Sequence, residues 1–284
     1  MVKVAFQGEL GAYSELAIYE CFGNDVKVVP KEAFSEVFEA VSSKETEHGV
    51  LPFENSLTGS IHENYDLMLD HDLVITGEIK LRIVHNLIVN KGVKLSDIKR
   101  VYSHPQALSQ CKKFLSGLNG VELISIYDTA GAARNIKENA SPVEAAVASA
   151  QAAVDYDLEI IESGIESNHM NFTRFHVLSR ELNDEVPDSK TSIVFSTKNI
   201  PGVLFKSLSV FALRDIDLYK IESRPLHGTP WKYIFYLDFD GDIRQDNIKK
   251  AIAHLEEIAE FLKFLGSYPK GNEVTGQIQE RRDR

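Results

Sequence analysis

The sequence contains little cysteine and no long hydrophobic run, and both absences restrict what it can be. Its 284 residues include two cysteines, Cys21 and Cys111, which are too few for a disulfide framework or a four-thiolate zinc site. Both lie among apolar residues at helical spacing, so we expect buried, reduced thiols and a cytoplasmic location. No stretch of about eighteen apolar residues occurs, and the first residues already have a strand pattern. We therefore expect neither a transmembrane helix nor a signal peptide.

Positive charge is also scarce, and several catalytic signatures are missing. The chain has 31 Lys and Arg against 42 Asp and Glu, a formal net charge of −11, which argues against nucleic-acid binding. Its nine histidines include no H-x-x-x-H pair and have no cysteine nearby at a ligand spacing, so no metal site is expected. The sequence has no G-x-G-x-x-G turn, no phosphate loop and no G-x-S-x-G elbow. Dinucleotide binding and serine-hydrolase chemistry are thus disfavoured.

The first 160 residues alternate short apolar runs with helical patterns, which is typical of a layered α/β structure. Residues 73–90 are rich in β-branched side chains and long enough for more than one strand. We interpret them as a crossing between two lobes, with a second crossing near 157–171. Residues 105–115 predict one helix with proline at its first position. Its apolar face includes Cys111, which we interpret as a core residue rather than a nucleophile.

The composition changes after residue 180. Residues 181–190 are acidic, contain proline and have little periodicity, so we interpret them as a linker between domains. Residues 191–270 then follow the order βαββαβ, with a last helix expected at 247–262, which predicts a ferredoxin-like unit. Residues 271–284 are polar and charged and are expected to form a loose tail.

Four strand-to-helix junctions in the first domain share small hydroxyl, amide or glycine residues. Helix N-termini present free N–H groups and a positive dipole end, and the carboxyl ends of strands open toward one crevice. Taken singly, each junction is better explained as an ordinary helix cap. Four together predict a cleft for a small carboxylate anion, without need for a basic patch. They are Gly8-Glu9-Leu10-Gly11, Asn55-Ser56-Leu57-Thr58-Gly59-Ser60, Ser103-His104-Pro105-Gln106 and Asp128-Thr129-Ala130-Gly131.

A fifth candidate segment is Asn171-Phe172-Thr173-Arg174-Phe175. If it is a strand, Asn171, Thr173 and Phe175 share one face. An amide, a hydroxyl and an aromatic ring on one face suit a partly polar pocket. An ordinary strand at a sheet edge explains the pattern equally well.

These motifs, in this order, resemble the prephenate dehydratase family. The segment Asn171–Phe175 resembles the family's N-x-T-R-F signature, and Glu222-Ser223-Arg224-Pro225 resembles the E-S-R-P segment of its ACT regulatory domain. Three further matches are to P-x-E-N-S-x-x-G, S-H-P-Q-A-L and D-T-A, found here at Pro52–Gly59, Ser103–Leu108 and Asp128–Ala130. The resemblance covers residues 1 to about 270.

The resemblance implies a bilobed catalytic domain, like periplasmic binding proteins, over residues 1–180. It implies the conversion of prephenate to phenylpyruvate, CO₂ and water in phenylalanine biosynthesis, without a cofactor or metal. Thr173 is then the proton donor to the leaving hydroxyl. His104 would cap its helix, and Arg174 would hold its strand in place. The residues implied to hold the substrate are Asn55, Ser56, Ser103, His104, Gln106, Thr129, Asn171 and Phe175.

The ACT domain implies feedback control by L-phenylalanine, bound where two such domains pair. A homodimer is then the smallest assembly, and a homotetramer is also expected. The implied effector residues are Pro201, Gly202, Val203, Leu204, Glu222, Ser223, Arg224 and Pro225. Val203 departs from the alanine that is frequent in the family.

Two other functions are also compatible with the sequence. Arogenate dehydratase performs the same chemistry on the transaminated substrate, and the sequence does not distinguish the two. A non-catalytic amino-acid-sensing module would use the same bilobed fold for binding alone.

Overall fold

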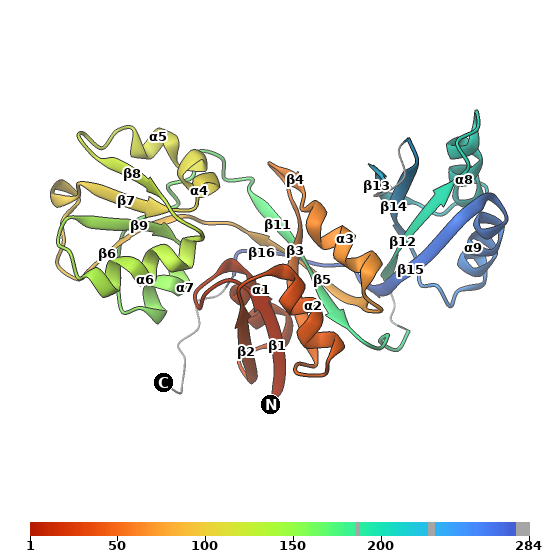
Figure 1. Cartoon of the computed structure of the whole chain (residues 1–284), viewed down its shortest axis with the longest axis horizontal. Coiled ribbons are helices and arrows are strands. Elements are labelled where there is room, and N and C mark those ends of the chain that lie inside the picture. Colours follow the sequence, from red (N-terminus) through yellow and green to blue (C-terminus); the bar gives the residue numbers. More distant parts are fainter. Residues whose placement is uncertain (186–187, 227–230, 277–284) are drawn as a thin grey trace. The chain divides into compact units, whose positions relative to one another are not determined.

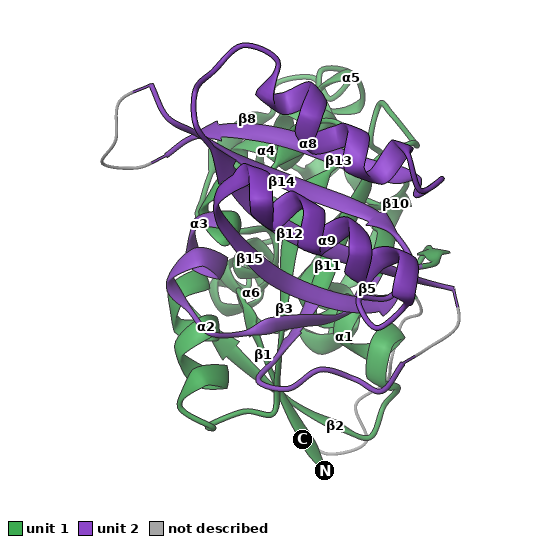
Figure 2. Ribbon diagram, turned by 90° about the vertical axis from the view of Figure 1, so that its right-hand side faces the viewer, with its two compact units in different colours: residues 1–65, 79–176, 272–284 green, residues 66–78, 177–271 purple. Residues whose placement is uncertain are grey.

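A computed structural model describes residues 1–185, 188–226 and 231–276, and the chain divides into two compact units (Figures 1 and 2). Unit 1 comprises residues 1–65, 79–176 and 272 onward, and unit 2 comprises residues 66–78 and 177–271. Both mix helices with sheets, so the predicted α/β class is confirmed. None of the described helices is long and apolar enough to cross a membrane.

The first sheet of unit 1 has the strand order β16-β5-β11-β3-β1-β2, with β4 paired to β3. Its strands β1, β2 and β3 are parallel, and helices α1 and α2 pack on them. Val4 and Phe6 of β1 and Val50 of β3 are fully buried. The elements of this part are β1 (Val2–Gln7), α1 (Tyr13–Phe22), β2 (Val26–Lys31), α2 (Phe34–Ser42), β3 (His48–Asn55), β4 (Gly59–Ser60), α3 (His62–Asp70), β5 (Val74–Arg82), β11 (Phe172–Ser179) and β16 (Glu273–Val274). The ends of three of them, residues 66–70 of α3, 74–78 of β5 and 177–179 of β11, belong to unit 2.

The second sheet of unit 1 has the order β10-β6-β9-β7-β8. Its central strand β9 is buried throughout because apolar clusters cover both faces of the sheet. The elements are β6 (Asn86–Val89), the 3₁₀ turn η1 (Leu95–Asp97), β7 (Arg100–Ser103), α4 (Pro105–Gln110), α5 (Lys112–Leu115), β8 (Glu122–Ser125), α6 (Thr129–Asn139), β9 (Glu144–Ala148), α7 (Ala150–Asp155) and β10 (Glu159–Ser163).

The chain passes between these two sheets in two places. Residues 83–85 join β5 to β6, and residues 164–171 join β10 to β11. Both passages lie within the segments where the sequence predicts crossings. They run side by side, since Ile83 N–H donates to Asn171 O at 2.8 Å and Ile165 N–H donates to His85 O at 3.0 Å.

Unit 2 has the predicted element order βαββαβ, and its antiparallel sheet has the order β13-β14-β12-β15. An apolar core lies between this sheet and its two helices. The segment 66–78 also belongs to this unit, where Lys263 Nζ donates to three carbonyl oxygens at the end of α3, at 2.8–3.1 Å. The elements are β12 (Ser189–Thr197), α8 (Val203–Ala212), β13 (Leu218–Pro225), β14 (Tyr233–Asp240), α9 (Asp246–Ile258) and β15 (Ala259–Pro269).

Two helices differ from their prediction. The expected helix at 105–115 is interrupted at Cys111, whose φ of −95° and ψ of 6° end α4 and precede α5. The expected helix at 247–262 ends at Ile258, because the following residues pair with β12, as in Leu262 with Phe195. That pairing gives their backbone groups partners in the sheet in place of a further helical turn.

The chain ends and the cysteines also differ in part from expectation. Glu273 and Val274 of the expected loose tail form β16, paired in parallel with β5, while residues 277–284 lie outside the described residues. In the expected linker, residues 189–190 already belong to β12, and residues 186–187 lie outside the described part. Cys111 is fully buried and Cys21 only half-buried, and both are free thiols.

Candidate active site

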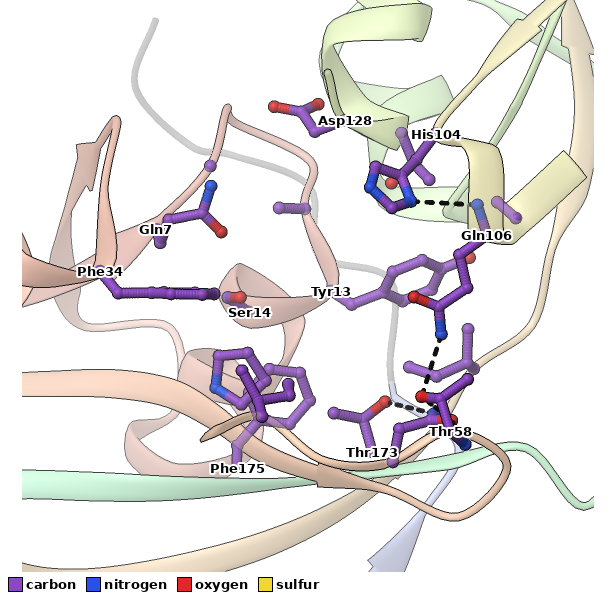
Figure 3. A pocket seen from close by; sticks show the side chains of 18 of the residues that line it. Gln7, Tyr13, Ser14, Phe34, Thr58, His104, Gln106, Asp128, Thr173 and Phe175 are labelled. Carbon is purple, nitrogen blue, oxygen red and sulfur yellow. Dashed lines mark hydrogen bonds between the residues drawn. The ribbon is translucent and has the colours of Figure 1, made fainter. Parts of the chain in front are cut away.

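A cavity of about 470 Å³ lies in unit 1 and takes its walls from both sheets (Figure 3). Each of the four predicted junctions contributes to it, through Gly8, Asn55 with Thr58, His104 with Gln106, and Asp128 with Thr129. The segment 171–175 supplies three more side chains. Residues far apart in the sequence thus meet at one pocket, and they come from the junctions between strands and helices that the sequence predicts to converge.

Asn55, Asn171 and Thr173 form a hydrogen-bonded cluster on one wall of this pocket. Asn55 Nδ2 donates to Asn171 Oδ1 at 2.7 Å and to Thr173 Oγ1 at 3.1 Å. All three residues are at least nine-tenths buried. Because the Thr173 hydroxyl accepts the bond from Asn55, its own proton is available to a group in the pocket.

The other end of the Asn55 side chain shapes the loop that follows β3. Asn55 Oδ1 accepts hydrogen bonds from the backbone N–H groups of Leu57 and Thr58, at 3.1 and 3.2 Å, and from the Thr58 hydroxyl at 3.2 Å. Gln106 Nε2 in turn donates to Thr58 Oγ1 at 3.3 Å. One amide therefore holds both the Thr173 side chain of β11 and the loop that meets helix α4.

His104 is the N-cap of α4, as the sequence predicts. Its Nδ1 accepts a hydrogen bond from Gln106 N–H at 3.2 Å. Burial lowers the pKa of His104, while the nearby Asp128 carboxylate acts to raise it. The imidazole is therefore neutral near neutral pH, and with Nδ1 accepting, its proton resides on Nε2. The ring lines the pocket, so Nε2–H is a donor for a ligand (Figure 3).

An apolar wall faces the polar cluster. Phe175 is 2% exposed and follows Thr173 on the same face of β11, and Phe34 lies across the pocket from the donor groups (Figure 3). Pro52, Ile61 and Ile83 also line the pocket with apolar side chains. Apolar surface next to directed donors excludes water from part of a ligand and leaves its polar groups to the donors.

The charge of the pocket is unusual for an anion site. Among the described residues that line it, the ionisable acidic groups are Glu63 and Asp128, and no lysine or arginine takes part. Helices α1, α4 and α6 instead begin at the pocket, with their first residues at Tyr13, Pro105 and Thr129. The positive dipole ends of helices attract carboxylates without a side-chain cation. Part of this capacity is already used, because Gln106 N–H of α4 is bonded to His104 Nδ1 and Gly131 N–H of α6 to Asp128 Oδ1.

Two of the predicted substrate residues do not line this pocket. Ser103 is fully buried, and its hydroxyl donates to Val147 O at 2.6 Å, which ties β7 to β9. Ser56 is exposed, and its hydroxyl donates to Met170 O at 2.8 Å and accepts from Phe172 N–H at 2.9 Å. Backbone partners thus occupy both hydroxyls, and the two serines support the site from outside it.

The structure also places the remaining predicted site residues. Gln106 and Thr129 line the pocket, as His104 does. Arg174 points away from the Thr173 face and lies 3.4 Å from the Glu54 carboxylate of β3. Burial raises the pKa of Cys111 to about 12, with a further contribution from Glu166, so this cysteine is not a thiolate nucleophile.

Several lining residues have no signal in the sequence. Tyr13 and Gln110 occupy helical positions whose sequence pattern indicates only packing. In the structure, Tyr13 OH donates to Val84 O at 2.8 Å, and Gln110 Oε1 accepts from Asn171 Nδ2 at 3.2 Å. The further unpredicted lining residues include Gln7, Phe34, His85 and Tyr127. Their partners lie tens of residues away, so local pattern does not reveal them.

The predicted effector segments lie at one end of the sheet in unit 2. Ser196 of β12 and Arg224 of β13 both pair with Ile234 of β14, so the carboxyl ends of β12 and β13 are at the same edge. Residues 201–204 follow β12 at the start of α8, and residues 222–225 end β13. Within unit 2, Arg224 also forms an ion pair with Asp66 of α3 at 2.5 Å.

No cluster of three or more His, Cys, Asp or Glu side chains suited to a metal ion occurs among the described residues.

Comparison with known proteins identifies related chains. The family model for prephenate dehydratase matches residues 4–183. Arogenate dehydratase/prephenate dehydratase 2 of Arabidopsis thaliana, described as chloroplastic, is 48% identical over 281 residues, which cover 94% of this chain and 73% of that protein. The solved structure of prephenate dehydratase from Arthrobacter aurescens in complex with L-Phe is 30% identical with a TM-score of 0.87, covering 95% of this chain and 90% of that one.

A second solved structure with the same TM-score of 0.87 is GqqA, described as a novel type of quorum quenching acylase. It is 32% identical, and the match covers 94% of this chain and 97% of that one. Because one fold can host different activities, similarity of fold alone does not assign a function to this chain.

Proposed function

Because the chain belongs to the prephenate dehydratase family, we propose that it converts prephenate to phenylpyruvate, CO₂ and water. The observation that carries this proposal is the cluster of Asn55, Asn171 and Thr173 on the pocket wall. In that cluster a buried hydroxyl has its acceptor side occupied and its proton free for a ligand. A leaving hydroxyl group needs such a donor.

The proposed reaction needs one proton and a fixed geometry. Thr173 Oγ1 donates its proton to the C4 hydroxyl of prephenate as the C–O bond breaks. The electron pair of the breaking bond between the ring and its carboxylate completes the aromatic ring, and CO₂ and water leave. A proton from solvent then restores the Thr173 hydroxyl. Because an aliphatic hydroxyl is a weak acid, its proton moves during C–O cleavage rather than before it.

The remaining groups have binding roles in this proposal. His104 Nε2–H, Gln106, Thr129 and the N-termini of α1, α4 and α6 would hold the carboxylates of the substrate. Charge-assisted hydrogen bonds of this kind contribute about 1.5–3 kcal/mol each. Phe175 would keep the departing carboxylate poorly solvated, which favours its conversion to neutral CO₂.

Arogenate is a second candidate substrate, and the charge of the pocket favours it. Arogenate carries an ammonium group in place of the ketone, and Glu63 and Asp128 line the pocket without a lysine or arginine among the described lining residues. An ammonium group would offset these carboxylates, whereas the keto acid would not.

Turnover of both substrates at neutral pH tests the proposed function. The proposed function requires a larger kcat/KM with prephenate, measured as phenylpyruvate release, than with arogenate, measured as phenylalanine release, whereas the charge of the pocket alone would favour arogenate. The opposite order would reassign the substrate to arogenate. If neither compound reacted, amino-acid sensing would replace catalysis as the best explanation of the site.

We further propose that L-phenylalanine regulates the enzyme through unit 2. Residues 201–204 and 222–225 share one end of its sheet, which supports a common ligand site. Arg224 of this group pairs with Asp66 of α3, and Glu63 in the first turn of the same helix lines the pocket. An effector with different affinities for two positions of α3 would shift activity through this helix.

The proposed assembly is a homodimer or homotetramer formed through unit 2. Strand β13 lies at an edge of its sheet and exposes Tyr219 and Ile221, and α8 exposes Phe205 to 77%. Exposed apolar side chains beside an unpaired strand edge favour pairing with a second copy.

Regulation and assembly are tested together by adding L-phenylalanine during activity and sedimentation measurements. We expect activity to fall and the sedimentation profile to change over the same range of phenylalanine concentration. If both measurements stayed constant, the proposed regulation would be wrong.

A further inference from the structure

Glu166 is a deeply buried carboxylate outside the pocket. It lies in the 164–171 passage between the two sheets of unit 1, and its side chain is 1% exposed. A buried charge is costly unless it is paired and hydrogen-bonded, so its environment must compensate for the lost water. Glu166 does not line the pocket, so direct contact with a ligand does not account for a carboxylate at this position.

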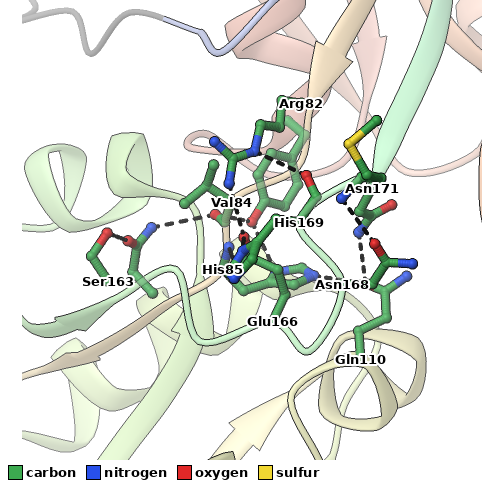
Figure 4. A network of polar contacts seen from close by, with 12 residues as sticks. Arg82, Val84, His85, Gln110, Ser163, Glu166, Asn168, His169 and Asn171 are labelled. Atoms are coloured by element: carbon green, nitrogen blue, oxygen red, sulfur yellow. Dashed lines mark hydrogen bonds and ion pairs between the residues drawn. The ribbon is translucent and has the colours of Figure 1, made fainter.

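The partners of Glu166 belong to both passages between the sheets (Figure 4). Its Oε2 accepts a hydrogen bond from the backbone N–H of His85 at 3.0 Å. Its Oε1 lies 3.2 Å from His169 Nδ1 and 3.7 Å from Arg82 Nη2. Arg82 Nε also donates to His169 O at 3.2 Å. Glu166 therefore fastens residues 82–85 to residues 166–169.

A continuous series of hydrogen bonds leads from Glu166 to the pocket. The side chain of His85 donates from Nε2 to Gln110 Oε1 at 2.8 Å, and Gln110 Oε1 also accepts from Asn171 Nδ2 at 3.2 Å. Asn171 Oδ1 then accepts from Asn55 Nδ2, which also donates to Thr173 Oγ1. The carboxylate is thus linked to the Thr173 hydroxyl by successive hydrogen bonds that begin at the backbone N–H of His85.

The orientation of the His85 ring is set by its surroundings. The hydroxyl of Tyr13 lies 2.9 Å from His85 Nδ1, and the backbone N–H of His85 is held by Glu166. Burial lowers the pKa of His85, so the neutral ring with its proton on Nε2 is the form that donates to Gln110. Displacing the His85 backbone would turn the Gln110 amide and, through it, Asn171.

We propose that Glu166 is a positioning residue for the dehydration, which holds Asn171 and Thr173 in register with helix α4 by fixing His85 and Gln110. The inference rests on the proposed function but concerns a group that does not touch the substrate. A misplacement of reacting groups by about 1 Å can reduce the rate by about 10²-fold. Loss of the carboxylate is therefore expected to lower kcat more than it weakens substrate binding.

The test compares Glu166→Ala with Glu166→Gln and with a matched control, Glu144→Ala. Glu144 is also a buried carboxylate of unit 1 with an arginine partner, Arg100 at 2.6 Å, but it does not line the pocket. We expect Glu166→Ala to lower kcat by about 10- to 100-fold with KM changed less than about threefold. Glu166→Gln retains an acceptor for the His85 N–H and should restore most of the kcat.

The control variant Glu144→Ala distinguishes a loss of positioning at the site from a general loss of stability. Glu144→Ala should lower the Tm as Glu166→Ala does and leave kcat unchanged. Equal losses of kcat in these two variants would overturn the proposal, as would an unchanged kcat in Glu166→Ala. A double-mutant cycle with Asn171→Ala should show less than multiplicative loss, because both changes act on one series of contacts. Fully multiplicative losses would contradict the connection through Asn171.

Hydrogen exchange provides a readout independent of turnover. The amides of Ile83 and Ile165, which bond across the two passages, should exchange faster in Glu166→Ala than in Glu144→Ala. Unchanged protection of these amides would overturn the proposal. A wild-type protein inactive on both substrates would contradict the proposed function, whereas the exchange result would still show whether Glu166 holds the two passages together.

Discussion

Thr173→Val is expected to lower kcat by about 10²- to 10⁴-fold, which is the typical contribution of a positioned proton donor. Valine keeps the shape of threonine but has no proton to give to the leaving hydroxyl. The buried cluster should survive, because Asn55 Nδ2 still has Asn171 Oδ1 and Phe172 O as acceptors. Stopped assays of product release at saturating substrate, together with the Tm, measure both effects.

Thr173→Ser is the matched control for this prediction. Serine retains the hydroxyl and loses one methyl group, so most of the kcat should remain. An active Thr173→Val variant would show that another group supplies the proton. An equally inactive Thr173→Ser variant would point to packing of the methyl group instead.

Asn55→Asp is expected to lower kcat by at least about 10²-fold, although the loop after β3 keeps its shape. Aspartate retains an oxygen for the N–H groups of Leu57 and Thr58. It lacks the Nδ2 donor, so its second oxygen faces Asn171 Oδ1 and the Thr173 hydroxyl. The hydroxyl would then donate to this carboxylate and lose its proton for the substrate.

A control for Asn55→Asp is Asn90→Asp, in which the replaced amide donates to Ile136 O at 2.7 Å and does not line the pocket. Asn90→Asp should affect the Tm without a large change in kcat. If Asn55→Asp kept its kcat while its structure remained intact, the orientation of the Thr173 proton inferred from the hydrogen bonds would be wrong.

Local sequence pattern was sufficient for much of the fold and for part of the site. Alternation along a strand put Asn171, Thr173 and Phe175 on one face, and all three line the pocket. The junction residues converge because parallel strands share an edge, which is a property of the fold class rather than of any pair of residues. His104 caps α4 because a residue before a first-turn proline is held in an extended conformation.

Features that depend on distant partners were not predictable in this way. Ser103 and Ser56 have the composition of anion-binding residues, but backbone atoms of β9 and of the 170–172 segment occupy their hydroxyls. Residues 259–262 have a helical pattern, yet pairing with β12 makes them a strand. The contacts of Glu166 with Arg82 and His85 join segments about eighty residues apart. In the sequence, none of these three residues differs from an ordinary polar residue, so their contacts could not be predicted.

We propose that this pocket removes CO₂ and water from its substrate with Thr173 as the proton donor. The release of phenylpyruvate and CO₂ from prephenate by the wild type and by Thr173→Val tests this proposal at neutral pH, where unaided aromatisation is slow. We expect equal amounts of the two products from the wild type and a rate lower by about 10²-fold or more in the variant. Equal rates for the two proteins, or no reaction by the wild type with prephenate or arogenate, would contradict it.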